Sequence, residues 1–128
     1  MSIEWTWIDP AVVQTIHQSQ IARHGGLDGV RDQGLIDSAL ARPRNLAAYG
    51  DPDAADLAAA YAVVIAKNHG FLDGNKRTAL VVALLFLAEN GFRGTVDQAE
   101  VVRLMEAVAD GTIDEPAAAD WLRSRLVR

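Results

Sequence analysis

Apolar residues recur every three or four positions along most of the chain, the spacing that places them on one face of an α-helix. Helix-capping residues, prolines and glycines divide this pattern into about six segments. Few β-branched residues alternate with polar ones, so a sheet-based fold is not expected. The pattern predicts an all-α fold, a compact bundle of about six helices around a central apolar helix. In chain order, the expected helices begin near Asp9, Asp32, Asp53, Asp73 or Asn75, Asp97 and Asp114.

One predicted helix, over residues 75–90, is apolar on nearly every side. Its large apolar residues include Leu80, Val81, Leu84, Leu85 and Leu87. A helix without a polar face needs neighbours all round. We therefore expect this segment to be the central helix of the bundle.

The segments between helices are marked by proline and glycine. Pro43 is expected to end the second helix, because a proline inside a helix removes a hydrogen bond and crowds the preceding turn. Residues 45–52 are then expected to form a surface loop. Residues 91–96 are expected to hold a short extended piece.

Composition narrows the class of protein. The chain has 128 residues, which suits a single domain over residues 1–128. With 50% hydrophobic and 23% charged residues, a folded globular protein is expected. A net charge of −5 argues against sequence-independent binding to nucleic acid or to an anionic membrane. The absence of cysteine excludes disulfides, thiol catalysis and cysteine-ligated zinc.

No segment of the sequence is typical of export or membrane insertion. The first ten residues, MSIEWTWIDP, have neither the basic start nor the cleavage site of a signal peptide. The longest apolar run, residues 79–88, is about half of what a membrane span requires. We therefore expect a cytoplasmic protein that binds neither membrane nor nucleic acid directly.

Side chains of the types used in catalysis are concentrated in the stretch HGFLDGNKR, from His69 to Arg77. A glycine-containing turn that leads into a helix presents free backbone N–H groups and the positive end of the helix dipole, which suits phosphate. Gly74 lets the backbone approach such an anion, and Lys76 and Arg77 add positive charge. Cations are usually disfavoured at a helix N-terminus, so a bound anion is expected there.

Two further residues of this stretch suit phosphate chemistry. Asp73 could bind Mg²⁺, since magnesium held with nucleotide phosphates uses one or two carboxylates and several waters. His69 could act as a general base toward a hydroxyl group, because histidine gains and loses its proton near neutral pH. An ordinary structural interpretation is also open, in which His69 ends one helix, Asp73 caps the next, and Lys76 and Arg77 are solvated. Phe71 is expected to be a buried anchor in either case.

The other two histidines, His17 and His24, lie on the first predicted helix without a paired carboxylate pattern. We expect them to be surface or packing residues. No HExxH, CxxC, GxSxG or P-loop pattern occurs, so zinc proteolysis, nucleophile-elbow hydrolysis and Walker-type nucleotide binding have no support.

The stretch HGFLDGNKR resembles the signature of the Fic/Doc superfamily, His-x-Phe-x-Asp-[Gly/Ala]-Asn-[Gly/Lys]-Arg, and its lysine is similar to the death-on-curing (Doc) branch. Upstream, RHGGLDGVRDQGLIDSAL resembles the glycine-rich segment of that branch. Downstream, NKRTALVVALLFLAENG resembles its central helix and ADGTIDEPAAADWLRSRL its closing helix. The resemblance covers nearly the whole chain.

The resemblance implies an all-helical fold whose motif loop and following helix bind ATP with Mg²⁺. In the Doc branch the implied reaction is phosphorylation of a threonine of elongation factor Tu, which stops translation. On this sequence, the resemblance makes His69 the base that activates the target hydroxyl and Asp73 the Mg²⁺ ligand. The residues that it implies around the phosphates are Gly74, Asn75, Lys76 and Arg77.

Two positions depart from the Doc pattern. Gly74 stands where Doc toxins usually have alanine, and Val81 stands where the Doc helix has a polar asparagine. An adenylyltransferase, which transfers AMP to a protein hydroxyl as Fic members do, is therefore an alternative to a kinase. A non-catalytic helical interaction protein is a second alternative.

The resemblance also implies a toxin–antitoxin pair, in which the antitoxin folds a C-terminal segment as a helix on the toxin. Such a segment docks an apolar stripe into a groove between helices. We expect this groove along the first and third helices and residues 45–52. The alanine-rich face over residues 54–62 would leave room there for one more helix.

Overall fold

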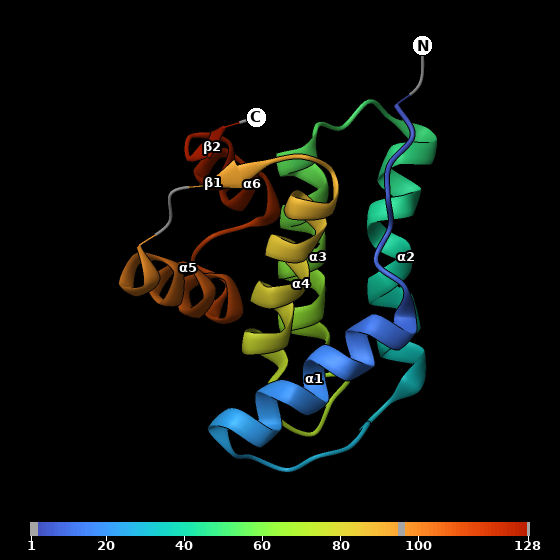
Figure 1. Cartoon of the computed structure of the whole chain (residues 1–128), viewed down its shortest axis with the longest axis vertical. Helices are drawn as coiled ribbons and strands as arrows, with labels where there is room; N and C mark the ends of the chain where they lie inside the picture. Colours follow the sequence, from blue (N-terminus) through green and yellow to red (C-terminus); the bar gives the residue numbers. More distant parts are fainter. Residues whose placement is uncertain (1–2, 95–96, 128) are drawn as a thin grey trace.

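The computed structural model describes residues 3–94 and 97–127. Within these ranges the chain forms six helices and one pair of short antiparallel strands, β1 and β2 (Figure 1). The predicted all-α fold is confirmed, and the extended piece expected within residues 91–96 is β1. The elements are α1 (Pro10–His24), α2 (Gln33–Tyr49), α3 (Ala54–Asn68), α4 (Asn75–Glu89), β1 (Arg93–Gly94), α5 (Gln98–Asp110), α6 (Glu115–Arg123) and β2 (Leu126–Val127).

Aspartate caps account for most of the helix starts. At α3 the cap is reciprocal: the Asp53 carboxylate accepts a hydrogen bond from the Asp56 N–H at 2.9 Å, and the Asp56 carboxylate accepts one from the Asp53 N–H at 3.0 Å. Four other helices begin after an aspartate whose side chain accepts from a first-turn N–H, namely Asp9, Asp32, Asp97 and Asp114.

Helix α3 is the centre of the bundle, where it packs against α2, α4, α5 and α6. Figure 1 shows α4 lying alongside it. The prediction that residues 75–90 form the central helix is therefore wrong. Helix α4 nevertheless packs against α3 more extensively than any other helix does. The small side chains of α3 let helices approach on every side, whereas several large residues of α4 are only half-buried, including Leu80, Val81, Leu84 and Leu85.

Helix α2 continues through Pro43 to Tyr49, so the prediction that Pro43 ends it is wrong. A proline inside a helix costs about 3 kcal/mol. Here the proline belongs to the buried face of α2, together with Ile36, Ala39 and Leu40. Packing of this face against α3 offsets the cost, and the expected loop over residues 45–52 is shortened to the few residues before α3.

The alanine-rich face of α3 has no room for a further helix. Each alanine within residues 54–62 is at most 5% exposed, because the domain's own helices already cover it. The prediction that an antitoxin groove lies along this face is therefore wrong. Small side chains admit any helix that packs closely, and here the same chain supplies those helices.

The longest of the six helices, α2, has 17 residues. Within residues 3–94 and 97–127, no helix has the combination of length and apolar character that crossing a membrane demands.

Candidate active site

The stretch predicted to bind phosphate connects α3 to α4, and its residues 69–74 are called the motif loop below. Both ends of the loop have left-handed backbone, with φ of 52° at His69 and 79° at Gly74. Glycine adopts such angles freely, but a residue with a side chain loses about 1–2 kcal/mol. Among the described residues, His69 is the only one other than glycine with positive φ. Strain of this kind is concentrated at functional sites, and the His69 side chain is exposed.

The motif loop is closed from within by Asn75. The Phe71 N–H donates to Asn75 Oδ1 at 3.1 Å, and Asn75 Nδ2 donates to the Phe71 carbonyl at 3.0 Å. Phe71 is 3% exposed, which confirms the prediction that it is a buried anchor. The side chain of Asn75 is thus committed to the shape of the loop, and only its backbone N–H is left to face a phosphate.

A second segment, residues 25–32, lies along the motif loop and supports it. Val30 forms an antiparallel bridge with Phe71. The Leu72 N–H donates to the Gly29 carbonyl at 3.1 Å, and the N–H groups of Arg31 and Asp32 donate to the Gly70 carbonyl at 2.8 and 3.0 Å. The glycine-rich segment noted in the sequence therefore forms the outer wall of the loop.

The same segment fixes two charged residues of the motif. The Leu27 N–H donates to Asp73 Oδ2 at 2.7 Å, and Arg77 Nη2 donates to the Gly25 carbonyl at 3.1 Å. Asp73 therefore does not cap α4, so the interpretation of Asp73 as the N-cap of that helix is wrong. The backbone of residues 25–27 orients a carboxylate and a guanidinium that flank the start of α4.

His17 is a residue of the site that the sequence did not identify as functional. Its side chain is 2% exposed, its ring stacks on Phe71 with centroids 3.8 Å apart, and Nε2 lies 2.8 Å from the Asp73 carbonyl oxygen. His24, on the same helix, is exposed. The prediction that these two histidines are packing or surface residues is confirmed, with His17 packed directly against the motif loop.

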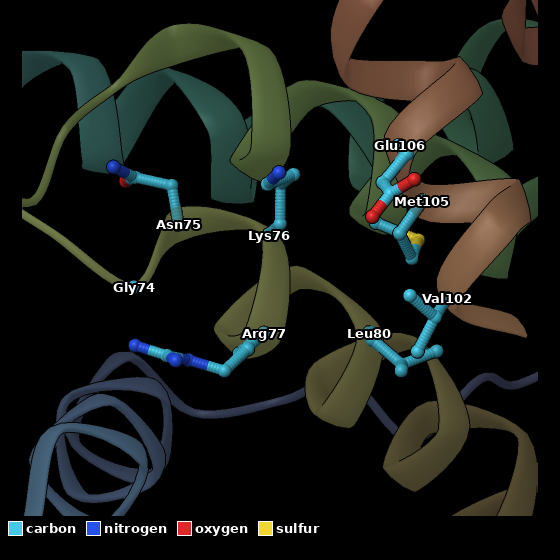
Figure 2. Close-up of a pocket in the computed structure, with 8 residues that line it drawn as sticks. All are labelled: Gly74, Asn75, Lys76, Arg77, Leu80, Val102, Met105 and Glu106. Carbon is cyan, nitrogen blue, oxygen red and sulfur yellow. The ribbon is translucent and has the colours of Figure 1, made fainter. Parts of the chain in front are cut away.

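A pocket of about 410 Å³ opens beside the N-terminus of α4 (Figure 2). The first turn of α4 forms one wall, and α5 forms the other. Of the predicted site residues, His69 and Asp73 do not line it. The sequence did not indicate that α5 contributes to the pocket, because its amphipathic pattern predicts a helix and nothing about a site. The lining residues are Gly74, Asn75, Lys76, Arg77, Leu80, Val102, Met105 and Glu106.

The electrostatics at the start of α4 favour an anion. No side chain from the described ranges caps this helix, and its first backbone hydrogen bond runs from the Thr78 N–H to the Gly74 carbonyl at 2.9 Å. The N–H groups of residues 75–77 therefore point out of the helix end, where the dipole is positive. Lys76 is exposed beside them, and Arg77 Nε is buried without a hydrogen-bond partner among the described residues.

The carboxylates near the pocket are too few to hold a metal ion by themselves. Within the described part of the chain, no three His, Cys, Asp or Glu side chains gather in a group that could bind one. Asp73 offers Oδ1, because only Oδ2 accepts a hydrogen bond from a described residue. Asp73 Oδ1 therefore fits magnesium that arrives with a nucleotide and keeps most of its ligands as phosphates and waters.

Comparison with known proteins agrees with this geometry. The model of the Fic/DOC family matches residues 7–87, which include the motif loop and nearly all of α4. The chain belongs to the Fic/DOC family.

Two relatives place the chain close to the Doc members of that family. It is 38% identical over 117 residues to "Protein kinase doc" of Escherichia phage P1, covering 91% of this chain and 92% of the relative. It is 43% identical over 101 residues to "Toxin Doc" of Mycolicibacterium smegmatis, covering 73% of this chain and 77% of the relative. The protein is a homologue of these two Doc proteins.

Proposed function

We propose that this protein is the cytoplasmic toxin of a toxin–antitoxin pair and that it transfers a phosphoryl group from ATP to a threonine of elongation factor Tu. One observation carries the proposal. The uncapped N-terminus of α4, with Lys76 and Arg77 in its first turn, directly follows the loop that presents His69 and Asp73. Two relatives named as a kinase and a toxin support the same function.

The pocket beside α4 suits a nucleotide in size and in chemistry. Its volume of about 410 Å³ lies in the range of small-molecule sites. The polar end, at residues 74–77, would receive the phosphates. The apolar end, formed by Leu80, Val102 and Met105, would receive the nucleoside.

In the proposed reaction His69 accepts the proton of the threonine hydroxyl. The hydroxyl oxygen forms a bond to the γ-phosphorus, while the bond from that phosphorus to the β,γ-bridging oxygen breaks and ADP leaves. The first-turn N–H groups of α4, Lys76 and Arg77 stabilise the charge on the phosphoryl oxygens. Asp73 would hold Mg²⁺, which neutralises phosphate charge when it is bound.

Lys76 favours phosphoryl over adenylyl transfer. With a lysine in the anion turn, the triphosphate is expected to bind with its terminal phosphoryl group facing His69. The adenylyltransferase alternative is favoured by Gly74, the residue typical of Fic members. In this chain Gly74 has φ of 79°, and a Cβ there would lie 3.1 Å from Ile21 Cδ1, so glycine suits this position for local reasons as well.

The variant His69→Ala tests the catalytic assignment. The His69 side chain is exposed, so we expect the variant to fold and to lose both growth arrest on expression and transfer to elongation factor Tu. The control is His24→Ala, which removes an exposed histidine on α1 and should remain toxic. A fully toxic His69→Ala protein would contradict the role of His69.

We also propose a cognate antitoxin whose C-terminal segment folds as a helix on this protein. The relative named as a toxin supports such a partner. Co-expression with the neighbouring open reading frame, followed by pull-down, tests this part. A stable complex that abolishes growth arrest is expected, and its absence would contradict the partner while leaving the kinase proposal standing.

A further inference from the structure

His17 is the one histidine that the described structure buries, and its ring contacts Phe71 and Asp73 of the motif loop. Its ring lies against Phe71 at a centroid distance of 3.8 Å with an interplanar angle of 10°. Its Nε2 meets the carbonyl oxygen of Asp73, a residue 56 positions further along the chain. A Cβ added to Gly74 would lie 3.7 Å from the same edge of the ring. The imidazole is thus a contact between α1 and the turn that precedes α4.

The hydrogen bond has a defined direction. A carbonyl oxygen can only accept, so His17 Nε2 bears the proton and donates it to Asp73. The other ring nitrogen, Nδ1, lies 3.9 Å from the carboxylate of Asp28, which is 66% exposed and too distant for a hydrogen bond. The contact therefore requires a proton on Nε2 and identifies the Asp73 carbonyl as its acceptor.

Asp73 is consequently held at two points from two different segments. His17 fixes its carbonyl, and the Leu27 N–H fixes Oδ2 of its carboxylate at 2.7 Å. The first contact sets the peptide plane between Asp73 and Gly74, where the chain turns into α4. The second contact leaves Oδ1 available. The direction of Oδ1 therefore depends on the orientation of the backbone that His17 holds.

We propose that His17 is a positioning residue for the reaction: its Nε2–H holds the Asp73 carbonyl so that the Asp73 carboxylate faces the magnesium–nucleotide. The inference rests on the proposed function, because it assigns Asp73 to Mg²⁺. His17 itself touches neither the nucleotide nor the target threonine in this role. Residues that orient a metal ligand typically change metal affinity or activity by about 10- to 100-fold when they are replaced.

Two substitutions separate positioning from packing. His17→Phe keeps an aromatic ring on Phe71 but has no donor for the Asp73 carbonyl. His17→Gln loses the ring but keeps an N–H₂ group near the position of Nε2. The control is His24→Phe, an equivalent change at an exposed position of the same helix.

The experiment measures phosphoryl transfer to elongation factor Tu over a range of Mg²⁺ and ATP concentrations, after circular dichroism has shown that each variant is folded. We expect His17→Phe to need about 10- to 100-fold more Mg²⁺ for half-maximal rate, His17→Gln to recover most of the wild-type value, and His24→Phe to match wild type. A His17→Phe protein equal to wild type, or a His17→Gln protein no better than His17→Phe, would overturn the proposal.

A second measurement does not depend on activity. Nitrogen NMR spectra of the histidine rings in the intact wild-type protein should identify His17 as the Nε2–H tautomer with a proton that exchanges slowly with solvent. An Nδ1–H tautomer would overturn the positioning role even in an active enzyme. If the wild-type protein transfers no phosphate to any tested target while the ring has the expected tautomer, the proposed function fails and the contact between His17 and Asp73 stands.

Discussion

The side-chain amide of Asn75 forms two reciprocal hydrogen bonds with the backbone of Phe71, at 3.1 and 3.0 Å, and both residues are buried. The amide uses its donor and its acceptor at once, which a carboxylate in its place could not do. This pair closes the motif loop and so fixes the path of the backbone from Phe71 to the start of α4.

Replacing Asn75 by alanine should destabilise the protein strongly. The change leaves the buried N–H and carbonyl of Phe71 without partners, which we expect to lower the free energy of unfolding by about 2–4 kcal/mol. Urea denaturation measures this change. Asn45→Ala, at an exposed position of α2, is the control and should stay within about 0.5 kcal/mol of wild type. Equal effects at the two positions would contradict the closing role of Asn75.

The two substitutions Asp73→Asn and Asp73→Ala separate metal binding from loop support. Asparagine can still accept the hydrogen bond from the Leu27 N–H, whereas alanine cannot. Both variants should lose Mg²⁺-dependent phosphoryl transfer, but only Asp73→Ala should lose about 1 kcal/mol of stability. Transfer by Asp73→Asn at the wild-type rate and Mg²⁺ requirement would be incompatible with the assignment of Asp73.

Adjacent glycines offer a matched pair beside the motif loop. Both have positive φ, 79° at Gly25 and 115° at Gly26, so alanine is strained at either position. A Cβ at Gly25 meets no described atom within 4 Å, whereas a Cβ at Gly26 would lie 3.1 Å from Asp73 Cβ and 3.2 Å from Ile21 Cδ1. Gly26→Ala should therefore impair phosphoryl transfer more than Gly25→Ala does, and should lower the melting temperature further. The reverse order in both assays would mean that this close contact does not matter.

Acid should weaken the junction between α3 and α6. Hydrogen bonds from Arg123, at 2.7 and 3.0 Å, lower the pKa of Asp53 from 3.8 to about 2. Because the folded-state pKa lies below the unfolded-state value, the stabilisation is present above pH 3.8 and is lost as the pH falls toward about 2. Both side chains are partly exposed, so solvent screens the pair and the effect is small. Denaturation of wild type and Arg123→Gln at several acidic pH values should give a shallower decline for the variant.

Features that depend on local chemistry were predictable from the sequence. An aspartate cap acts within about three residues, so helix starts could be recognised at positions such as Asp9 and Asp53. The motif residues from His69 to Arg77 are contiguous, and their types were sufficient to indicate an anion site.

Features that depend on distant partners were not predictable. Pro43 stays inside α2 because its ring is buried against another helix, and no local signal encodes that packing. The alanines of α3 indicated close packing but not which helix would take the space. His17 lies 56 residues before Asp73, and Glu106 lines the pocket from α5, so the place of each beside the motif emerges only in the folded chain.

The most direct test of the central claim is the intact mass of elongation factor Tu after incubation with this protein, ATP and Mg²⁺. We predict a gain of one phosphoryl group on a threonine, with no change when the His69→Ala variant is used. A gain of one AMP would contradict the kinase assignment and favour the adenylyltransferase. An unchanged mass with folded wild-type protein would contradict the assignment of elongation factor Tu as substrate.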